Sequence, residues 1–279
     1  MTTFYPSESL FVDEDLSEIL PFAVHLAMEA SRVIMPHFRR CAVETKADGS
    51  EVTIADRLAE ERIRALLDAA CPGHGVLGEE FGGEISVDGY TWVLDPIDGT
   101  TYFALGMPLF GTLIGLLHRG EPVLGVVRFP AQGETLTGFA GGACRRQIDG
   151  MEGARVRTAA DKPIATAFCS ASGIHGSDLS DSGPGRPSLG GLARRAGKFR
   201  FLGDCQQHAL LCRGAIDLAV DTIMKPWDTA ALVPCIRAAG GVATSLDGAE
   251  QGVVQSGSLL AACGPRLHRQ ALRSLASAA

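Results

Sequence analysis

The chain has 279 residues and a formal net charge of −7 at neutral pH, with 46% hydrophobic and 20% charged residues. This length allows a large buried core, in one α/β unit or in two closely packed halves. The acidic balance, without a basic stripe, argues against a polyanionic partner such as nucleic acid. The N-terminal segment lacks the basic and apolar regions of a signal peptide, and we expect no stretch apolar enough to span a membrane.

Eight cysteines are scattered along the chain without a Cys-x-x-Cys pair. In a chain of this length, their spacing is typical of reduced, mostly buried thiols, which predicts a cytoplasmic protein rather than a disulfide-bonded one. The seven histidines show no His-x-x-x-His spacing, so we expect no zinc site.

The first third of the chain combines long helical patterns with short strands. Apolar residues recur at helical spacing over residues 13–40 and again over residues 53–70, which predicts two helices. A short strand then leads to Glu79, and a second strand covers residues 90–94. Because Pro96 fixes its own φ and favours an extended residue before it, we expect the second strand to stop there.

The pattern changes to β-structure after Thr101. We expect strands over residues 110–118, 123–129, 135–139 and 144–148. Connections this short require antiparallel pairing, which excludes a doubly wound parallel sheet. Residues 173–191 are rich in Gly, Ser, Asp and Pro, and they predict a surface loop.

The last third mixes short strands and helices, and no internal repeat is present. We expect strands over residues 199–202, 216–221 and 259–263, and helices over residues 205–213, 229–239 and from Pro265 onward. The pair Gly240-Gly241 would end the second of these helices at its C-cap.

The run Trp-Val-Leu-Asp-Pro-Ile-Asp-Gly-Thr-Thr at residues 92–101 carries the most informative chemistry. Asp95 and Asp98 follow an apolar strand, and both carboxylates can converge on one point. Such hard oxygen ligands suit Mg²⁺, and Gly99 lets a backbone approach an anion closely. A helix that begins near Thr100 would favour a phosphate at the same place, against Asp98 and Gly99. The alternative is an Asp-Pro turn with an Asp N-cap, which is common in loops.

Three further segments accompany this run. They are Val-Thr-Ile-Ala-Asp at residues 52–56, Gly-Glu-Glu at residues 78–80 and Trp-Asp-Thr-Ala-Ala at residues 227–231. Together with residues 92–101, they resemble the inositol monophosphatase superfamily, the Mg²⁺-dependent, lithium-sensitive phosphomonoesterases. The resemblance covers nearly the whole chain, because the four segments appear in the family's order.

The resemblance implies an α+β fold, a layered α-β-α-β-α sandwich of the inositol monophosphatase and fructose-bisphosphatase type with a largely antiparallel first sheet. It implies one catalytic unit over residues 1–279. Residues 1–150 would form an N-terminal half with two helices, the metal-binding strands and the antiparallel sheet. Residues 151–279 would form a C-terminal half that sets substrate selectivity. By the same resemblance we expect a homodimer.

Hydrolysis of a phosphate monoester needs charge neutralisation on the phosphoryl oxygens, a nucleophilic water and a stabilised leaving oxygen, and two metal ions can supply all three. Matched to the family, Glu79, Asp95 and the Ile97 carbonyl would bind one Mg²⁺. Asp95, Asp98 and Asp228 would bind a second, and Glu79 would also hold a weaker third. Four gathered carboxylates repel one another, so the cluster makes sense only with cations present.

Two of the acidic residues also have a structural explanation. Residues 53–56 fit a capping box at the start of a helix, and on the residues alone this role is favoured for Asp56. The resemblance instead assigns Asp56, Thr100 and Glu79 to catalysis, with Asp56 and Thr100 positioning the attacking water. Asp228 also fits the N-cap of the helical run that follows it, and both of its roles can hold.

Other charged residues near these segments are expected to stay outside the chemistry. Lys46, in the segment Thr-Lys-Ala-Asp, is interpreted as a surface lysine, with an approach to the metal site as the alternative. Glu80 is expected to be solvated or to lie behind the metal ligands. The histidines are expected to be structural or exposed.

Segments in the second half of the chain separate the members of the superfamily better than the run at residues 92–101 does. The segments similar to histidinol-phosphatases of this fold lie at residues 108–114, 203–205, 208–211, 214–218 and 225–228. Gln206 and His208 depart from this subgroup, which often has aromatic residues there, and Trp227 stands where some members have tyrosine.

Histidinol phosphate carries an ammonium and an imidazole, which bind well to carboxylates. Asp204 and Asp221 lie where the family contacts the end of the substrate that carries no phosphate. As alternatives, Asp204 can cap the helix that follows it, and Asp221 can end a strand in a turn.

We therefore predict a Mg²⁺-dependent phosphomonoesterase that hydrolyses L-histidinol phosphate in the cytoplasm, with two or three Mg²⁺ ions. Its partner would be a small phosphate monoester, with no nucleic acid and no membrane. The first alternative is an inositol-1-phosphate or broad sugar-phosphate phosphatase. A non-catalytic binding or regulatory protein on the same scaffold would be expected to lack some of the four metal-binding carboxylates, and none is lost. A metal-dependent nuclease is disfavoured by the acidic balance.

Overall fold

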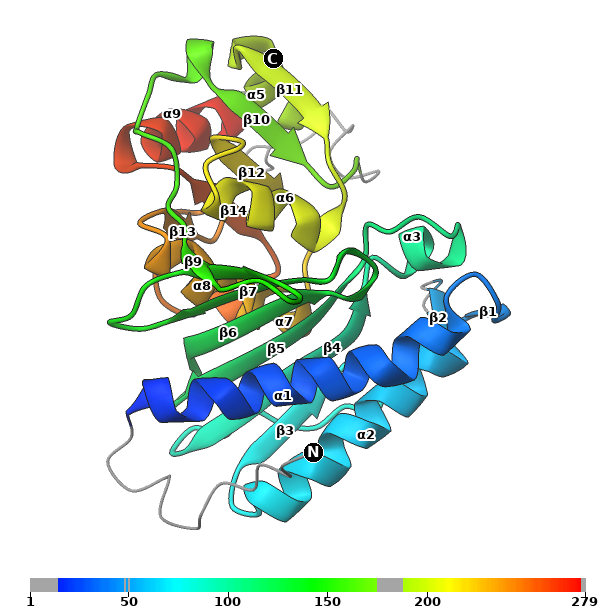
Figure 1. The fold of residues 1–279 in the computed structure, drawn as a ribbon. Helices are drawn as coiled ribbons and strands as arrows, with labels where there is room; N and C mark the ends of the chain where they lie inside the picture. Colours follow the sequence, from blue (N-terminus) through cyan, green and yellow to red (C-terminus); the bar gives the residue numbers. More distant parts are fainter. Residues whose placement is uncertain (1–14, 48, 50, 175–187, 277–279) are drawn as a thin grey trace.

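The computed structural model describes residues 15–47, 49, 51–174 and 188–276 (Figure 1). The helices are α1 Leu16–Ile34, α2 Ile54–Ala70, α3 Thr100–Ala104, α5 Leu189–Arg195, α6 Asp204–Cys212, α7 Pro226–Ala230, α8 Leu232–Ala238 and α9 Pro265–Ala276. Short 3-10 helices are η1 Met35–His37, η2 Pro130–Gln132, η3 Ile164–Thr166 and η4 Val253–Gln255. Most of the surface loop expected over residues 173–191 lies outside the described residues, and its last residues, from Leu189, begin α5.

The strands form two large sheets and one small hairpin. They are β1 Val43–Thr45, β2 Glu51–Thr53, β3 Gly75–Gly78, β4 Tyr90–Asp98, β5 Gly111–His118, β6 Glu121–Phe129, β7 Glu134–Phe139, β8 Arg145–Ile148, β9 Ala154–Arg155, β10 Phe168–Ala171, β11 Lys198–Phe201, β12 Leu218–Asp221, β13 Val242–Thr244 and β14 Leu259–Ala262. The seven-stranded sheet has the order β3-β4-β5-β6-β7-β8-β9, and the five-stranded sheet has the order β11-β10-β12-β14-β13.

These elements stack in five layers, which confirms the predicted α-β-α-β-α sandwich (Figure 1). Helices α1 and α2 cover one face of the seven-stranded sheet, and α7 and α8 pack on its other face. Helix α6 contacts both α8 and the five-stranded sheet, whose far side carries α9 with α5. In the seven-stranded sheet only the β3–β4 pair is parallel, so the sheet is largely antiparallel as expected.

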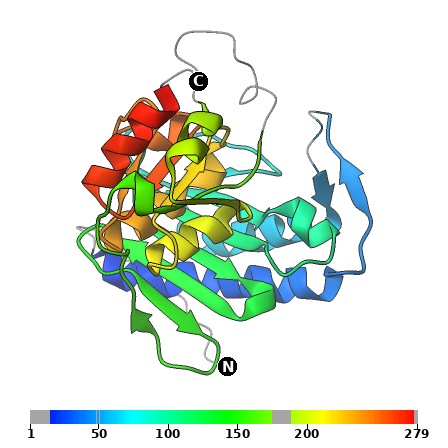
Figure 2. The same ribbon diagram turned by 90° about the horizontal axis from the view of Figure 1, so that it is seen from above.

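The β1–β2 hairpin was not expected from the sequence. Its strands pair antiparallel with Val43 opposite Thr53, and β2 runs directly into α2. Figure 2 shows the hairpin at the edge of the molecule beside α3, which β2 contacts. The strands have three residues each, too few for an alternation pattern to be visible in the sequence.

Helix α1 is the one described element whose length and apolarity would suit a membrane span, which the sequence analysis did not expect. Together with η1 it spans 22 residues, within which an 18-residue window has a mean hydropathy of 1.2. Its apolar side chains pack in the core under the seven-stranded sheet, with Phe22 against Trp92. The apolar face of a core helix accounts for the same composition.

Strand β4 does not stop at Pro96 but passes through a bulge. Asp95 lies opposite Leu113, and the pairing resumes with Asp98 opposite Gly111, so β4 contains one extra residue. Pro96 is tolerated because the residues of a bulge need not donate a ladder hydrogen bond. Side chains three apart on a regular strand point to opposite faces, and the extra residue returns Asp98 to the face of Asp95.

The helix expected over residues 229–239 is broken into α7 and α8. The ring of a proline clashes with the carbonyl of the residue four positions earlier, and for Pro234 that residue is Ala230, the last of α7. The break lets α7 present Asp228 at its own angle while α8 continues along the sheet.

A row of three glycines brings these two helices against the seven-stranded sheet. Gly115 pairs with Gly125, and Gly125 pairs with Gly138, across β5, β6 and β7. A Cβ on Gly115 would lie 2.7 Å from the Cβ of Ala230, and one on Gly125 would overlap the carbonyl oxygen of Ala231. The row therefore sets the distance between the sheet and the helix that carries Asp228.

We expect Gly125→Ala to destabilise the protein by about 1–3 kcal/mol or more, because the added methyl must push α7 and α8 off the sheet. Thermal or urea unfolding would measure this. As a control, Gly153→Ala adds a Cβ at an ordinary 3.6 Å from the Cβ of Gln147, so its effect should stay within about 0.5 kcal/mol. Equal stability of the two variants would contradict this account of the glycine row.

Candidate active site

Three carboxylates meet at the bulge of β4 and the start of α7. One oxygen from each of Asp95, Asp98 and Asp228 lies within 4.8 Å of the others. Within the described part of the chain, no other group of three or more His, Cys, Asp or Glu side chains converges in this way. The bulge and the helix break thus bring together three of the predicted metal ligands.

The donor set fits a hard divalent cation. Asp95 is 2% exposed, and its Oδ1 atom is buried without a hydrogen-bond partner among the described residues. Burial raises the pKa of Asp95 well above its usual range, and the charges of Glu79 and Asp98 raise it further. Burial also raises the pKa of Asp228 to about 7. Such carboxylates are costly as anions unless a cation binds between them.

Backbone N–H groups hold the other two carboxylates. The N–H of Cys205, at the start of α6, donates to Asp98 Oδ2 at 2.7 Å, and the N–H of Lys225 donates to Asp228 Oδ2 at 2.7 Å. Asp228 is therefore the third residue of α7, where it completes a capping box, rather than the N-cap expected from the sequence. The shift arises because Pro226 begins the helix.

Glu79 follows β3 and faces the same cluster. Its carboxylate accepts a hydrogen bond from Lys46 Nζ at 3.0 Å, and Lys46 also donates to Glu80 at 2.7 Å. Lys46 is thus not the surface lysine expected, and Glu80 is largely buried rather than solvated. Burial would lower the pKa of Lys46, but its bonds to Glu80 and Glu79 raise it above its usual value.

A buried glutamate of α2 shapes the turn that presents Glu79. The Glu60 carboxylate accepts from the N–H of Glu80 at 2.8 Å and pairs with Arg64. A Cβ on Gly78 would overlap this carboxylate, so a larger residue there would have to displace Glu60 from the N–H of Glu80. The sequence analysis missed Glu60, although it follows Asp56 by four residues and so lies on the same helix face.

Asp56 occupies the capping box that the residues alone favoured. Its Oδ2 accepts from the N–H of Thr53 at 2.8 Å and from the Thr53 hydroxyl at 2.6 Å. Burial raises the pKa of Asp56 to about 6. The hydrogen bonds from Thr53 lower this pKa, and the negative charges of Glu80 and Glu79 raise it. The capping geometry does not by itself test the catalytic assignment, because a capping carboxylate can also face a reacting water.

The Gly-Thr pair after Asp98 begins helix α3 as expected. Gly99 is the N-cap, with φ +83°, and Thr100 is the first helical residue. The Thr100 hydroxyl donates to the Ile97 carbonyl oxygen at 2.9 Å, whereas the hydroxyl bonded to Asp56 is that of Thr53. The Ile97 carbonyl, predicted as a metal ligand, therefore already accepts one hydrogen bond at the bulge.

A pocket of about 420 Å³ opens beside the cluster. It is lined by Gly49, Glu51, Glu79, Gly99, Thr100, Thr101 and Asp204. The pocket brings together four predicted site residues and Glu51, which the sequence analysis did not single out. The signal that could have found it is its place two residues before Thr53, on the same face of β2.

The two residues assigned to the distal end of the substrate differ in their surroundings. Asp204 lines the pocket, and its charge adds to the effect of burial in raising the pKa of Asp98. Asp221 ends β12 and is 5% exposed. Its carboxylate accepts from Gln207 Nε2 at 2.9 Å, and His208 Nε2 lies 2.6 Å from it. Asp204 is therefore accessible from the pocket, and Asp221 lies within a buried polar network.

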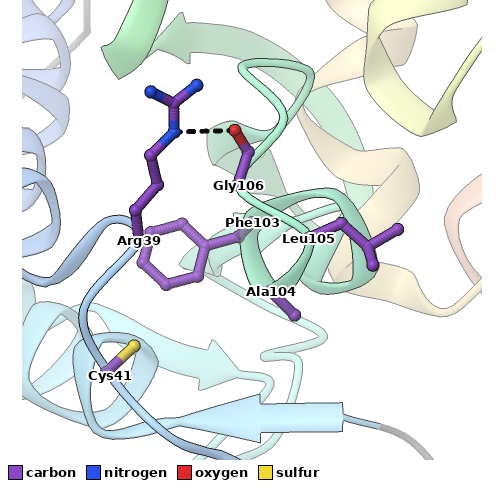
Figure 3. A pocket seen from close by; sticks show the side chains of 6 residues that line it. All are labelled: Arg39, Cys41, Phe103, Ala104, Leu105 and Gly106. Carbon is purple, nitrogen blue, oxygen red and sulfur yellow. Dashed lines mark hydrogen bonds between the residues drawn. The ribbon is translucent and has the colours of Figure 1, made fainter.

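A second pocket, of about 470 Å³, lies at the other end of α3 (Figure 3). Arg39 Nε donates to the Gly106 carbonyl oxygen at 2.9 Å, while the Phe103 ring turns inward. No carboxylate lines this pocket, so its donor set does not suit a metal. Its contacts anchor the end of α3 and thereby the placement of Thr100 at its start.

Comparison with known proteins gives one consistent family. The sequence model of the inositol monophosphatase family matches residues 15–279. A histidinol-phosphatase from Chlorobaculum parvum is 36% identical over 245 residues, which cover 87% of this chain and 91% of that protein. An inositol-1-monophosphatase from Mycolicibacterium smegmatis is 35% identical over 258 residues, which cover 90% of this chain and 89% of that protein.

The fold agrees with solved structures of similar proteins. The structure of an inositol monophosphatase from Zymomonas mobilis matches with a TM-score of 0.79 and 30% sequence identity. The match covers 94% of this chain and 98% of that chain.

The raised pKa of Asp228 predicts a pH-dependent stability of the metal-free protein. Because the folded-state pKa is about 7 and the usual value is 3.8, the folded state binds more protons. Stability should therefore fall as pH rises from about 4 to about 7, by an amount on the order of 3 kcal/mol. Asp228→Asn keeps an acceptor for the Lys225 N–H. Because asparagine does not titrate, the variant should lack the part of the fall in stability that Asp228 causes. Urea unfolding at several pH values would measure the difference.

Mg²⁺ should raise the melting temperature of the unmodified protein at pH 7 and have a smaller effect on Asp228→Asn. Asp68→Asn, on the exposed face of α2, is the matched control and should follow the unmodified protein throughout. Parallel stability curves for Asp228→Asn and the unmodified protein would show that Asp228 is not part of a repelling cluster.

Proposed function

The chain belongs to the inositol monophosphatase family and is a phosphatase of that family, and we propose that it hydrolyses L-histidinol phosphate to L-histidinol and phosphate with Mg²⁺. The observation that carries this proposal is the pocket lined by Asp204, which lies close enough to the carboxylate cluster to raise the pKa of Asp98. A substrate whose phosphate lies at the cluster would then place its other end beside Asp204. An ammonium or imidazole there would gain a charge-assisted hydrogen bond.

We assign the metal-holding roles to Glu79, Asp95, the Ile97 carbonyl, Asp98 and Asp228, for two Mg²⁺ ions and a weaker third at Glu79. When bound, such ions supply positive charge to the phosphoryl oxygens, the attacking water and the leaving oxygen. The orphaned Oδ1 of Asp95 and the mutual repulsion of the carboxylates support this assignment.

The remaining roles concern water and phosphate. Asp56, buried and with a pKa raised to about 6, would accept the proton of the attacking water at its carboxylate. Thr100 and Glu79 would position that water with it. Gly99 and Thr100, with Asp98, would contact the phosphate, since both line the pocket.

Asp221 is proposed to act at the distal end of the substrate through its charge. It lies close enough to Asp228 to raise the pKa of that residue, but its oxygens are engaged by Gln207 and His208. Asp204 lines the pocket and is the direct contact in this proposal, and Asp221 adds negative potential behind it.

An inositol-1-phosphate phosphatase is the second candidate. It is supported by the inositol-1-monophosphatase that is 35% identical to this chain, nearly as similar as the histidinol-phosphatase at 36%. The acidic lining of the pocket favours a cationic substrate over an uncharged polyol.

We further propose a cytoplasmic homodimer in which the whole chain acts as one catalytic unit without nucleic-acid or membrane partners. All eight cysteines lie in the described part of the chain, and none forms a disulfide there. This agrees with a reducing compartment. The dimer rests on the family resemblance alone.

Phosphate release from a panel of monoesters tests the proposed function. We expect kcat/KM for histidinol phosphate to exceed that for inositol-1-phosphate and fructose-1,6-bisphosphate by roughly tenfold or more, because the candidates share a phosphate and differ only at the distal end. EDTA should abolish turnover, and Mg²⁺ should restore it. Equal kcat/KM values for histidinol phosphate and inositol-1-phosphate would defeat the substrate proposal, and full activity in the metal-free protein would defeat the metal proposal.

Asp56→Asn separates catalysis from capping. Asparagine can still accept the hydrogen bonds of Thr53, so we expect a nearly unchanged melting temperature. If Asp56 accepts a proton from water, kcat should fall by roughly a hundredfold or more. Asp15→Asn, at the N-cap of α1, makes the same change at a cap without a neighbouring cluster and should leave kcat unchanged. A kcat for Asp56→Asn close to that of the Asp15 variant would show that Asp56 is only a cap.

A further inference from the structure

We propose that Glu51 of β2 is a second specificity-determining carboxylate of this pocket, which binds the ammonium group of the substrate together with Asp204. The inference rests on the proposed function, because it concerns the distal end of the same substrate. Substrate selectivity, expected from residues 151–279, would then also depend on a residue of the N-terminal half of the chain.

The placement of Glu51 follows from the β1–β2 hairpin. Successive residues of a strand point to opposite faces, so Glu51 lies on the same face of β2 as Thr53. Thr53 is fully buried, and its hydroxyl donates to Asp56 in the candidate active site. Glu51 is therefore turned towards the site, and it lines the 420 Å³ pocket with Thr100 and Asp204.

One oxygen of the Glu51 carboxylate lacks a hydrogen-bond donor. Its Oε2 atom is buried and has no hydrogen-bond partner within the described ranges. Four glutamates whose side chains are largely buried each have a cation: Glu29 pairs with Arg62, Glu60 with Arg64, Glu80 with Lys46, and Glu134 with Arg146. A carboxylate oxygen that is buried without a donor is destabilising, and a cation bound in the pocket would remove that cost.

The chemistry of the pocket favours a substrate ammonium as this cation. The metal-type cluster consists of Asp95, Asp98 and Asp228, and Glu51 is not part of it. A phosphate ester that lies against the cluster brings further negative charge close to Glu51 and Asp204. The phosphate ester of an uncharged polyol would leave that repulsion unbalanced, whereas an aminoalkyl phosphate balances it. Glu51 would thus attract substrates that carry an ammonium group and repel phosphate esters that lack one.

The test compares two substrates that differ only in the amine: histidinol phosphate and imidazolylpropyl phosphate, both with the Mg²⁺-loaded full chain. We expect Glu51→Gln to lower kcat/KM for histidinol phosphate by about tenfold, mainly through a higher KM, and to raise kcat/KM for the deaminated analogue slightly, because the charge that repels it is removed. Glu51→Asp, which keeps the charge, should retain part of the preference. Asp204→Asn should likewise erode it.

Glu44→Gln is the matched control, because it removes the same charge from the same hairpin at an exposed position outside the pocket. It should leave both kcat/KM values unchanged. Melting temperatures with and without Mg²⁺ show that each variant is folded and binds metal.

The outcomes separate the two proposals. An unmodified enzyme that does not prefer histidinol phosphate to its deaminated analogue overturns the amine-directed function, and this inference with it. A clear preference that survives in Glu51→Gln overturns the inference alone. An equal loss on both substrates, or a smaller Mg²⁺-induced rise in melting temperature for Glu51→Gln, would show that Glu51 acts at the phosphate or the metal instead.

Discussion

Repulsion between buried carboxylates is the constraint that this structure is built around. Asp95, Asp98 and Asp228 are gathered within a few ångströms, and burial and the charges of neighbouring carboxylates raise the pKa of each above its usual value. A folded chain holds such a group together only if the surrounding elements are rigid enough to resist the repulsion. The rest of the molecule supplies that rigidity, and a cation supplies the missing charge.

The rigidity comes from irregular features placed in regular elements. The bulge of β4 sets Asp95 and Asp98 on one face, and the break at Pro234 frees α7 to carry Asp228 to them. The row of glycines in β5, β6 and β7 lets α7 and α8 lie directly on the sheet. Each feature costs some local stability, and together they define the geometry of one site.

Charges around the cluster are divided between protein partners and the pocket. Lys46 neutralises Glu79 and Glu80 from the hairpin side, and Arg64 neutralises Glu60 beneath them. Towards the pocket, Glu51 and Asp204 add negative charge. The pocket therefore has a negative potential, which would distinguish substrates by the charge of their distal end.

Four short segments of the sequence were enough to predict the family, because they are local patterns, and the resemblance to that family implied the five-layer architecture and the residues of the acidic cluster. Apolar periodicity marked α1 and α2, short turns marked the antiparallel strands, and the run around Asp95 marked the site. What lies beside those residues depends on tertiary contacts. The faces of Glu51 and Glu60 follow from their local spacing to Thr53 and Asp56, but Lys46 and Glu60 contact Glu80 only because folding brings distant segments together. Folding also places β2 against α3, and burial then makes these charged residues partners of the site.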